Sequence, residues 1–247
     1  MSAKKQTKSK KKLYWLLAAV ALLAVLAVIL LTGETDTLAS ESEREETNAA
    51  ETTAPEVTDG RILRDALRIR NIGEYVDIYV EDGSDEAVSG LLMLEVENIS
   101  AEPIQYAQIN LTVGEETAEF TVSVLPAGGT AVLIEQNRMT YEEGVNYAEA
   151  EAECVHLAGF EKPLSLHEDK LKIQILDGAA NILNVSDEPI QGTIVICYKN
   201  ITNGVYHGGI AYRIRIEGGM KAGELKQVMA THLHETGSEI LFVDIVE

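Results

Sequence analysis

From about Leu67 onward, apolar and polar residues alternate along the chain with a period of two. Val76, Ile78 and Val80, for example, alternate with Tyr75, Asp77 and Tyr79, and the pattern recurs at 92–96, 109–113, 120–124, 171–175, 194–198, 212–216 and 240–246. Successive side chains of a strand point to opposite faces, so this alternation predicts strands with one buried face. Long stretches with a helical period are absent from this part of the sequence, which predicts an all-β fold.

Residues 147–154 alternate alanine with glutamate. Both residue types favour helices, but a strict period of two would place glutamates all round a helix. The segment is therefore predicted to be a further strand.

An internal repeat indicates how these strands are organised. Asn-Ile-Ser-Ala-Glu-Pro-Ile-Gln at 98–105 matches Asn-Val-Ser-Asp-Glu-Pro-Ile-Gln at 184–191, and Pro-Ala-Gly-Gly at 126–129 corresponds to Lys-Ala-Gly-Glu at 221–224. The offset grows from 86 to 95 residues, so the second copy holds about nine extra residues, placed around 200–209. Each copy is expected to end a strand, turn at Glu-Pro and begin the next strand. The repeat predicts two tandem β-sandwiches, at 61–166 and 167–247.

The strand, Asn-x-Ser-x-Glu-Pro-Ile turn and strand, followed by a glycine turn, resembles the immunoglobulin-like modules of bacterial envelope proteins. The unit resembles FxLYD-type domains in particular, and the resemblance covers residues 90–135 and 180–230. The whole arrangement, including the glycine-flanked run 208–219, is similar to membrane-anchored proteins of Gram-positive bacteria. This resemblance implies Ig-like sandwiches and a place in the cell envelope, and it brings no activity with it.

Near the N-terminus, Leu13–Leu31 is a run of 19 residues without a charge, with Tyr14 and Trp15 at its start. As a helix it is roughly 28 Å long, which matches the hydrocarbon core of a bilayer. Six lysines within residues 1–12 predict a cytoplasmic tail by the positive-inside rule. A single transmembrane helix is therefore predicted at 13–32. The alternative is a signal peptide cleaved near Thr37-Leu38-Ala39.

The charge changes sign after the predicted membrane helix. Residues 33–60 hold nine acids and one arginine and few large apolar side chains, which predicts an extended, disordered acidic stalk. Beyond the basic tail the chain has 14 basic and 40 acidic residues, a net charge of −26. Such a surface is repelled by nucleic acid and by anionic headgroups. We expect domains displayed on the outer side of the cell membrane, away from the bilayer.

Two groups of side chains are weak candidates for a metal site. His232 and His234 would project from one face of a strand, although spacing marks no third ligand. Asp82, Asp85 and Glu86 belong to an acidic run at 81–86, whose Asp-Gly pair is above all a hairpin turn signal. The alternative interpretation is a solvated strand face for the histidines and a turn for the acids.

The remaining candidates are basic or nucleophilic residues. The only basic cluster in the predicted outer part, Arg61, Arg64, Arg68 and Arg70, lies where the stalk meets the first domain. It either contacts an anionic wall polymer, pairs with the acids of the stalk, or is scattered surface charge. Cys154 and Cys197 fall one in each predicted domain and are expected to be buried separately rather than paired. The sequons beginning at Asn98, Asn110, Asn184 and Asn200 are interpreted as turn and strand residues.

No catalytic constellation stands out, so the sequence favours a non-enzymatic envelope protein that binds an unknown protein or wall component and needs no cofactor. Two alternatives remain open. One is an envelope hydrolase or metal-dependent enzyme that uses His232 and His234. The other is a sensor that signals through its membrane helix to a partner.

Overall fold

The computed structural model describes residues 60–246. These residues form fourteen β-strands and contain no α-helix. The first seven strands are β1 (Ile62–Leu63), β2 (Leu67–Tyr79), β3 (Glu86–Asn98), β4 (Ile104–Val113), β5 (Glu116–Leu125), β6 (Thr130–Ile134) and β7 (Glu151–Gly159). The next seven are β8 (Leu171–Leu176), β9 (Ala179–Asn184), β10 (Thr193–Thr202), β11 (Val205–His207), β12 (Tyr212–Ile216), β13 (Leu225–Met229) and β14 (Ser238–Val246). The prediction of an all-β fold is confirmed.

The second half of the chain repeats the strand pairing of the first half. In the first half, which we call copy one (β1–β7), β3 pairs with β6, and β4 lies between β5 and β7. In copy two (β8–β14), β9 pairs with β13, and β10 lies between β12 and β14. β11 has no counterpart in copy one, and it falls within the insertion that the sequence placed at 200–209.

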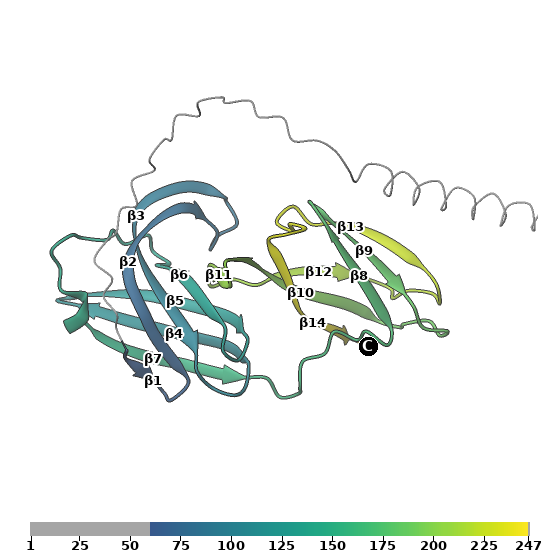
Figure 1. Ribbon diagram of the computed structural model, residues 1–247, viewed down its shortest axis with the longest axis horizontal. Helices are drawn as coiled ribbons and strands as arrows, with labels where there is room; N and C mark the ends of the chain where they lie inside the picture. The colour runs from purple at the N-terminus through teal and green to yellow at the C-terminus, as the bar shows by residue number, and fades with distance from the viewer. Residues whose placement is uncertain (1–59, 247) are drawn as a thin grey trace, which may run out of the picture. The chain divides into compact units, whose positions relative to one another are not determined.

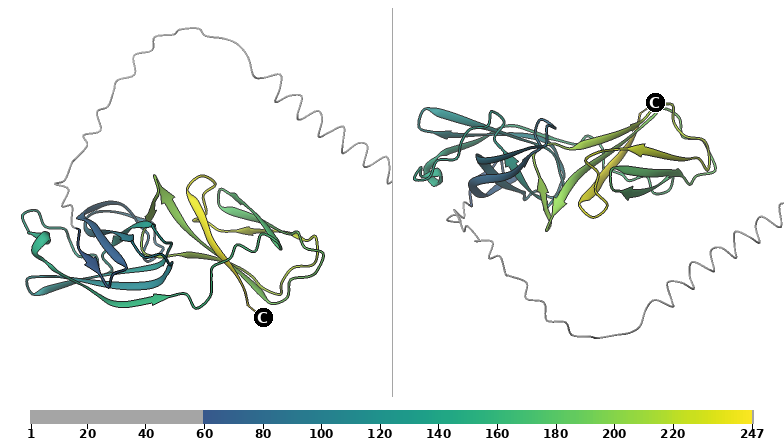
Figure 2. Two further views of the ribbon diagram at one scale, coloured as in Figure 1. Left: turned by 60° about the horizontal axis from the view of Figure 1, so that its bottom comes forward. Right: turned by 90° about the horizontal axis from the view of Figure 1, so that it is seen from above.

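Each copy has its own hydrophobic core. Copy one buries apolar side chains from both of its sheets, including Leu94 and Phe120, and copy two buries a smaller set that includes Ile196 and Ile214. Figures 1 and 2 show each copy as facing layers of strands, with the chain passing from β7 to β8 through residues 160–170. The predicted boundary at 166/167 falls within this connection.

β11 joins the two copies into one sheet. It pairs in parallel with β6 of copy one and antiparallel with β10 of copy two, so the strand order is β1-β2-β3-β6-β11-β10-β12, with β14 also paired to β10 (Figure 1). The other two sheets are β13-β9-β8 and β5-β4-β7. All described residues belong to one compact unit.

The repeated Asn-x-Ser-x-Glu motif is a buried turn that is the same in both copies. The Nδ2 atom of Asn98 donates to the carbonyl oxygens of Glu102, Leu125 and Pro126 at 2.9, 3.1 and 3.1 Å. Its Oδ1 atom accepts from the amide and the hydroxyl of Ser100 at 3.0 and 2.7 Å. A short polar side chain thus satisfies backbone groups that no ladder reaches.

The corresponding bonds in copy two differ by at most a few tenths of an ångström. Asn184 Nδ2 donates to Glu188, Met220 and Lys221 at 2.9, 3.4 and 3.0 Å, and Asn184 Oδ1 accepts from the Ser186 amide and hydroxyl at 3.0 and 2.7 Å. Both asparagines are fully buried. These bonds confirm the predicted correspondence between residues 126–129 and 221–224.

Three details of the strand predictions are wrong. Tyr147–Glu149 forms a 3-10 turn, and the strand predicted from 147 begins only at Glu151. In β2 the tyrosines face the interior, because Tyr75 is 7% exposed whereas Val76 is 65% exposed. Register shifts at two points of the β2–β3 ladder change which face is buried, and residue types alone do not locate such irregularities.

The third correction concerns the two histidines that were predicted to share one face of a strand. His232 and His234 lie in the connection between β13 and β14, on either side of Leu233, which is 1% exposed. Insertion of Leu233 into the core of copy two, rather than strand alternation, sets the direction of the imidazoles. The predicted membrane helix at 13–32 and the stalk lie outside the described residues. Within residues 60–246 we find no helix long and apolar enough to span a bilayer.

Candidate functional site

The junction between the copies contains a buried lysine. Lys199, on β10, is 0% exposed. Its Nζ donates to the carbonyl oxygens of Ser123, Gly208, Gly209 and Ile210 at 3.3, 3.1, 3.1 and 2.7 Å. Burial lowers the pKa of Lys199 to about 8, so the ammonium form still prevails at neutral pH. The four carbonyls compensate its charge and hold the 208–210 loop against β5 of copy one.

Glu81 lies on the other side of this loop. Its Oε1 atom accepts from the Gly209 amide at 2.6 Å, while Oε2 is buried with no hydrogen-bond partner. Burial raises the pKa of Glu81, and the Gly209 and Ile134 amides and the Lys199 charge act in the opposite direction. A side chain at 209 would not fit, because an added Cβ would lie 1.8 Å from the Thr121 carbonyl oxygen. These contacts fix the 208–210 loop of copy two against copy one.

The acidic run 81–86 forms the turn between β2 and β3, as its Asp-Gly pair predicts. Asp82 and Glu86 both pair with Arg138, at 3.0 and 2.7 Å, and Asp85 contacts His232 of copy two at 3.3 Å. The three acids therefore diverge to two different side chains, Arg138 and His232. Across residues 60–246 we find no group of three or more histidine, cysteine or acidic side chains placed to hold a metal ion.

The predicted arginine cluster is spread over copy one. Arg61 donates to the Tyr147 carbonyl at 3.1 Å and also to that of Ala150, and Arg64 donates to the Val155 carbonyl at 3.1 Å. Arg68 and Arg70 pair with acids across the β2–β3 ladder: Arg68 with Glu97 at 3.2 Å, and Arg70 with Glu95 at 3.6 Å and Glu97 at 4.0 Å. The four side chains thus serve separate contacts rather than converging on one site.

The two cysteines are buried and unpaired, as the sequence predicts. Burial raises the pKa of the Cys154 thiol and raises that of Cys197 to about 11, so both thiols are protonated at neutral pH. Asn98 and Asn184, the first residues of two sequons, use their amides inside the fold. Asn200, the first residue of another, accepts from the Ser238 hydroxyl at 2.7 Å. Asn110 lies on β4.

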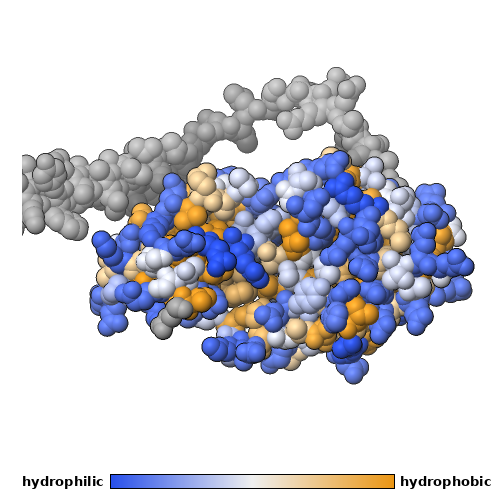
Figure 3. Space-filling model, turned by 180° about the vertical axis from the view of Figure 1, so that it is seen from behind, coloured by the Kyte–Doolittle hydropathy of each residue, from blue (hydrophilic) through white to orange (hydrophobic). Residues whose placement is uncertain are grey.

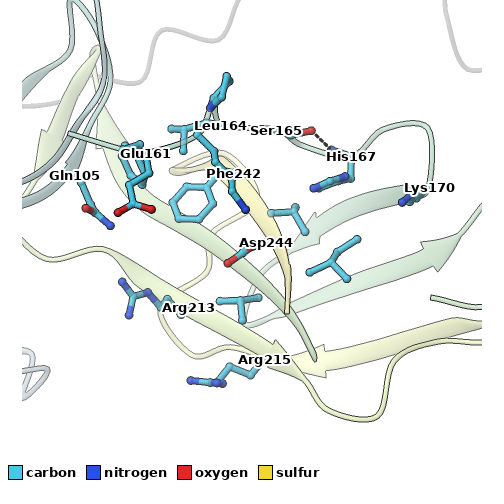
Figure 4. A pocket seen from close by; sticks show the side chains of 16 residues that line it. Gln105, Glu161, Leu164, Ser165, His167, Lys170, Arg213, Arg215, Phe242 and Asp244 are labelled. Carbon is cyan, nitrogen blue, oxygen red and sulfur yellow. Dashed lines mark hydrogen bonds between the residues drawn. The ribbon is translucent and has the colours of Figure 1, made fainter. Parts of the chain in front are cut away.

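A groove of about 850 Å³ lies between the 160–170 connection and the outer face of the β12-β10-β14 sheet. Figure 4 shows Phe242 and Asp244 of β14 between the connection on one side and Arg213 and Arg215 of β12 on the other. We call this feature the basic groove. Its charged side chains are Lys162, Lys170, Arg213, Arg215, Glu161 and Asp244.

Several contacts fix the connection over the sheet. The Val243 amide donates to the Ser165 carbonyl at 2.7 Å, and the His167 amide donates to the Ser165 hydroxyl at 3.0 Å (Figure 4). Phe160 packs edge-on against Phe242, with ring centroids 5.5 Å apart. The groove is therefore built by packing between two segments, and it combines aromatic surface with four cationic side chains and two carboxylates.

The basic groove is unusual for this chain. Residues 60–246 contain 13 lysines and arginines and 30 acids, a net charge of −17, whereas the groove carries a net charge of +2. Sequence reasoning did not single out these residues. A signal was present, since Arg213 and Arg215 alternate with buried Ile214 and Ile216. Only the fold brings Lys162 and Lys170 to the same place.

The surface elsewhere is polar with scattered apolar residues. The face drawn in Figure 3 shows apolar side chains in small patches between polar ones. Comparisons with protein-family models, with curated proteins and with solved structures returned no match.

Proposed function

We propose that this chain is a membrane-anchored, extracytoplasmic binding protein in which two Ig-like sandwiches act as one body and the basic groove takes an anionic ligand. The apolar run at 13–32 after a lysine-rich tail supports the anchor and its orientation. The repeated pairing scheme supports the tandem sandwiches. No sequence or structural feature of residues 60–246 favours a reaction over binding.

The proposal of an anionic ligand rests on the charge of the basic groove, which is positive although residues 60–246 as a whole are negative. Arg213 and Arg215 are exposed on one face of an edge strand, and side chains two residues apart on a strand are about 7 Å apart. Arginine forms strong paired hydrogen bonds with carboxylates and phosphates. A polymer with anionic groups at intervals of this size would place one group on each guanidinium, and its apolar parts would contact Phe242.

The test measures binding of two polyanions, polyglutamate and inorganic polyphosphate, to the full chain purified in detergent. We expect saturable binding of one of them that weakens steeply with salt, and at least a tenfold loss of affinity in Arg213→Gln/Arg215→Gln. Arg68→Gln/Arg70→Gln removes the same charge from copy one and is the matched control. Equal losses in both double variants, or no binding of either polymer, would overturn the proposal.

A further inference from the structure

We call the space between strands β5 and β6 of copy one its seam. A segment of copy two fills this space. β11 pairs in parallel along the edge of β6, with Val205, Tyr206 and His207 opposite Thr130, Ala131 and Val132. A few residues later, the Gly209 carbonyl accepts from the Ser123 amide of β5 at 2.7 Å. One extended segment therefore pairs with the edge of β6 and then contacts β5 at Ser123.

The inserted segment also completes a hydrophobic core. Tyr206 of β11 is 5% exposed and belongs to the core cluster of copy one rather than that of copy two. The Gly129 turn lies close to its ring, because an added Cβ there would be 3.2 Å from Tyr206 Cε2. Its hydroxyl donates to Glu239 at 2.9 Å. The segment thus supplies both ladder hydrogen bonds and an aromatic plug.

The equivalent seam of copy two is open. The counterparts of β6 and β5 are β13 and β12, which pair only with β9 and β10 among the described strands. A cavity of about 440 Å³ lies between these two edges, with Tyr212 and Ile214 on one side and Val228 and Met229 on the other. Met229 is 74% exposed. Exposed strand edges with apolar side chains are typical sites for pairing with another chain.

We infer that this open seam, the edges of β12 and β13, is an acceptor for an extended segment of a partner protein that adds as a strand parallel to β13. The partner segment carries an aromatic residue with two small residues beginning two positions later, since Tyr206 precedes Gly208 and Gly209 in this way in the occupied seam. Strand addition supplies affinity through backbone bonds and specificity through the aromatic side chain. Arg213 and Arg215 line both the seam and the basic groove, whereas Met229 lines the seam and not the groove.

The chain's own β11 is not the occupant, because it is already used within copy one, where Tyr206 is buried. An outside segment fits the space better. One end of the seam is bounded by His232, whose ring stacks on Tyr212 at 4.9 Å and contacts Asp85 of copy one at 3.3 Å. These contacts hold the Tyr212 ring beside the cavity, so the acceptor is formed before any partner arrives.

A synthetic peptide with the sequence of residues 202–210, labelled with a fluorophore, is the probe. Its binding to the full chain in detergent is followed by fluorescence anisotropy. We expect saturable binding, at least a fivefold loss of affinity in Met229→Lys, and a similar loss when the peptide carries Tyr206→Ala. Val246→Lys, an exposed position on β14 outside the seam, is the matched control and should bind as the parent chain does.

Binding that persists in Met229→Lys would mean that the peptide has displaced β11 from copy one, and this result overturns the inference. Absence of saturable binding also overturns it. Thermal unfolding of each variant establishes that it is folded. Because Met229 lines the seam and not the basic groove, Met229→Lys should leave polyanion binding unchanged, so failure of one proposal is distinguishable from failure of the other.

Discussion

The two copies share their buried turn but differ in their seams. Asn98 and Asn184 make the same hydrogen bonds, so the turn that each asparagine stabilises is the same in both copies. The insertion within copy two pairs with β6 and contacts β5 of copy one at Ser123, while β12 and β13 have no such partner segment within residues 60–246. Because of this short insertion, copy two donates a strand, β11, and copy one accepts it along β6.

The largest loss of stability is expected from removing the Tyr206 side chain, which fills the occupied seam of copy one. Tyr206→Ala should lower the free energy of unfolding by about 4 kcal/mol, because it empties part of the copy one core. Tyr212→Ala, in the open seam, should cost about 1 kcal/mol, since this side chain is only half-buried. Urea denaturation of the full chain measures both. Equal losses would show that the two seams do not differ in this way.

The repeated turn should respond equally in both copies. Asn98→Ala and Asn184→Ala should each cost about 3 kcal/mol, because each leaves several buried carbonyls without a donor. Ser100→Ala and Ser186→Ala are matched controls with a loss of about 1 kcal/mol each. Denaturant midpoints for the four variants provide the measurement. A large loss in only one copy would contradict the equivalence seen in the distances.

The buried lysine at the junction predicts a pH dependence. The folded pKa of Lys199 is about 8 and the ordinary value is 10.5, so the unfolded chain holds the proton more tightly between these two values. The free energy of unfolding therefore gains a contribution as pH rises from 8 to 10.5, of about 2 to 3 kcal/mol, and this contribution is absent below pH 8.

The comparison that isolates this contribution is between the parent chain and Lys199→Met, both measured by urea denaturation from pH 7 to pH 10. The difference in stability between them should shift in favour of the parent chain as pH rises. A difference that is constant across this range would mean that the lysine has its ordinary pKa in the folded state.

The sequence by itself determined the all-β class, most strand positions, the repeat and the place of the insertion. These features depend on local rules, since strand alternation is a period of two and a Glu-Pro turn or an Asp-Gly hairpin is encoded within a few residues. The same rules placed Cys154 and Cys197 in separate strands, where they are unpaired. They failed at Tyr75 and Val76, where a register shift changed the buried face.

Tertiary structure decided what long-range packing controls. Nothing in the local sequence distinguishes Lys199 from an ordinary polar residue of a strand. In the structure, carbonyl oxygens of both copies enclose its ammonium group. The sequence locates an insertion at 200–209, but only the structure shows that its strand β11 pairs with β6 of the other copy. The charge of the basic groove arises from β12 and from a connection some 50 residues earlier in the chain. Non-local pairing of this kind leaves no periodic trace, because its partners are chosen by the geometry of the folded sheets.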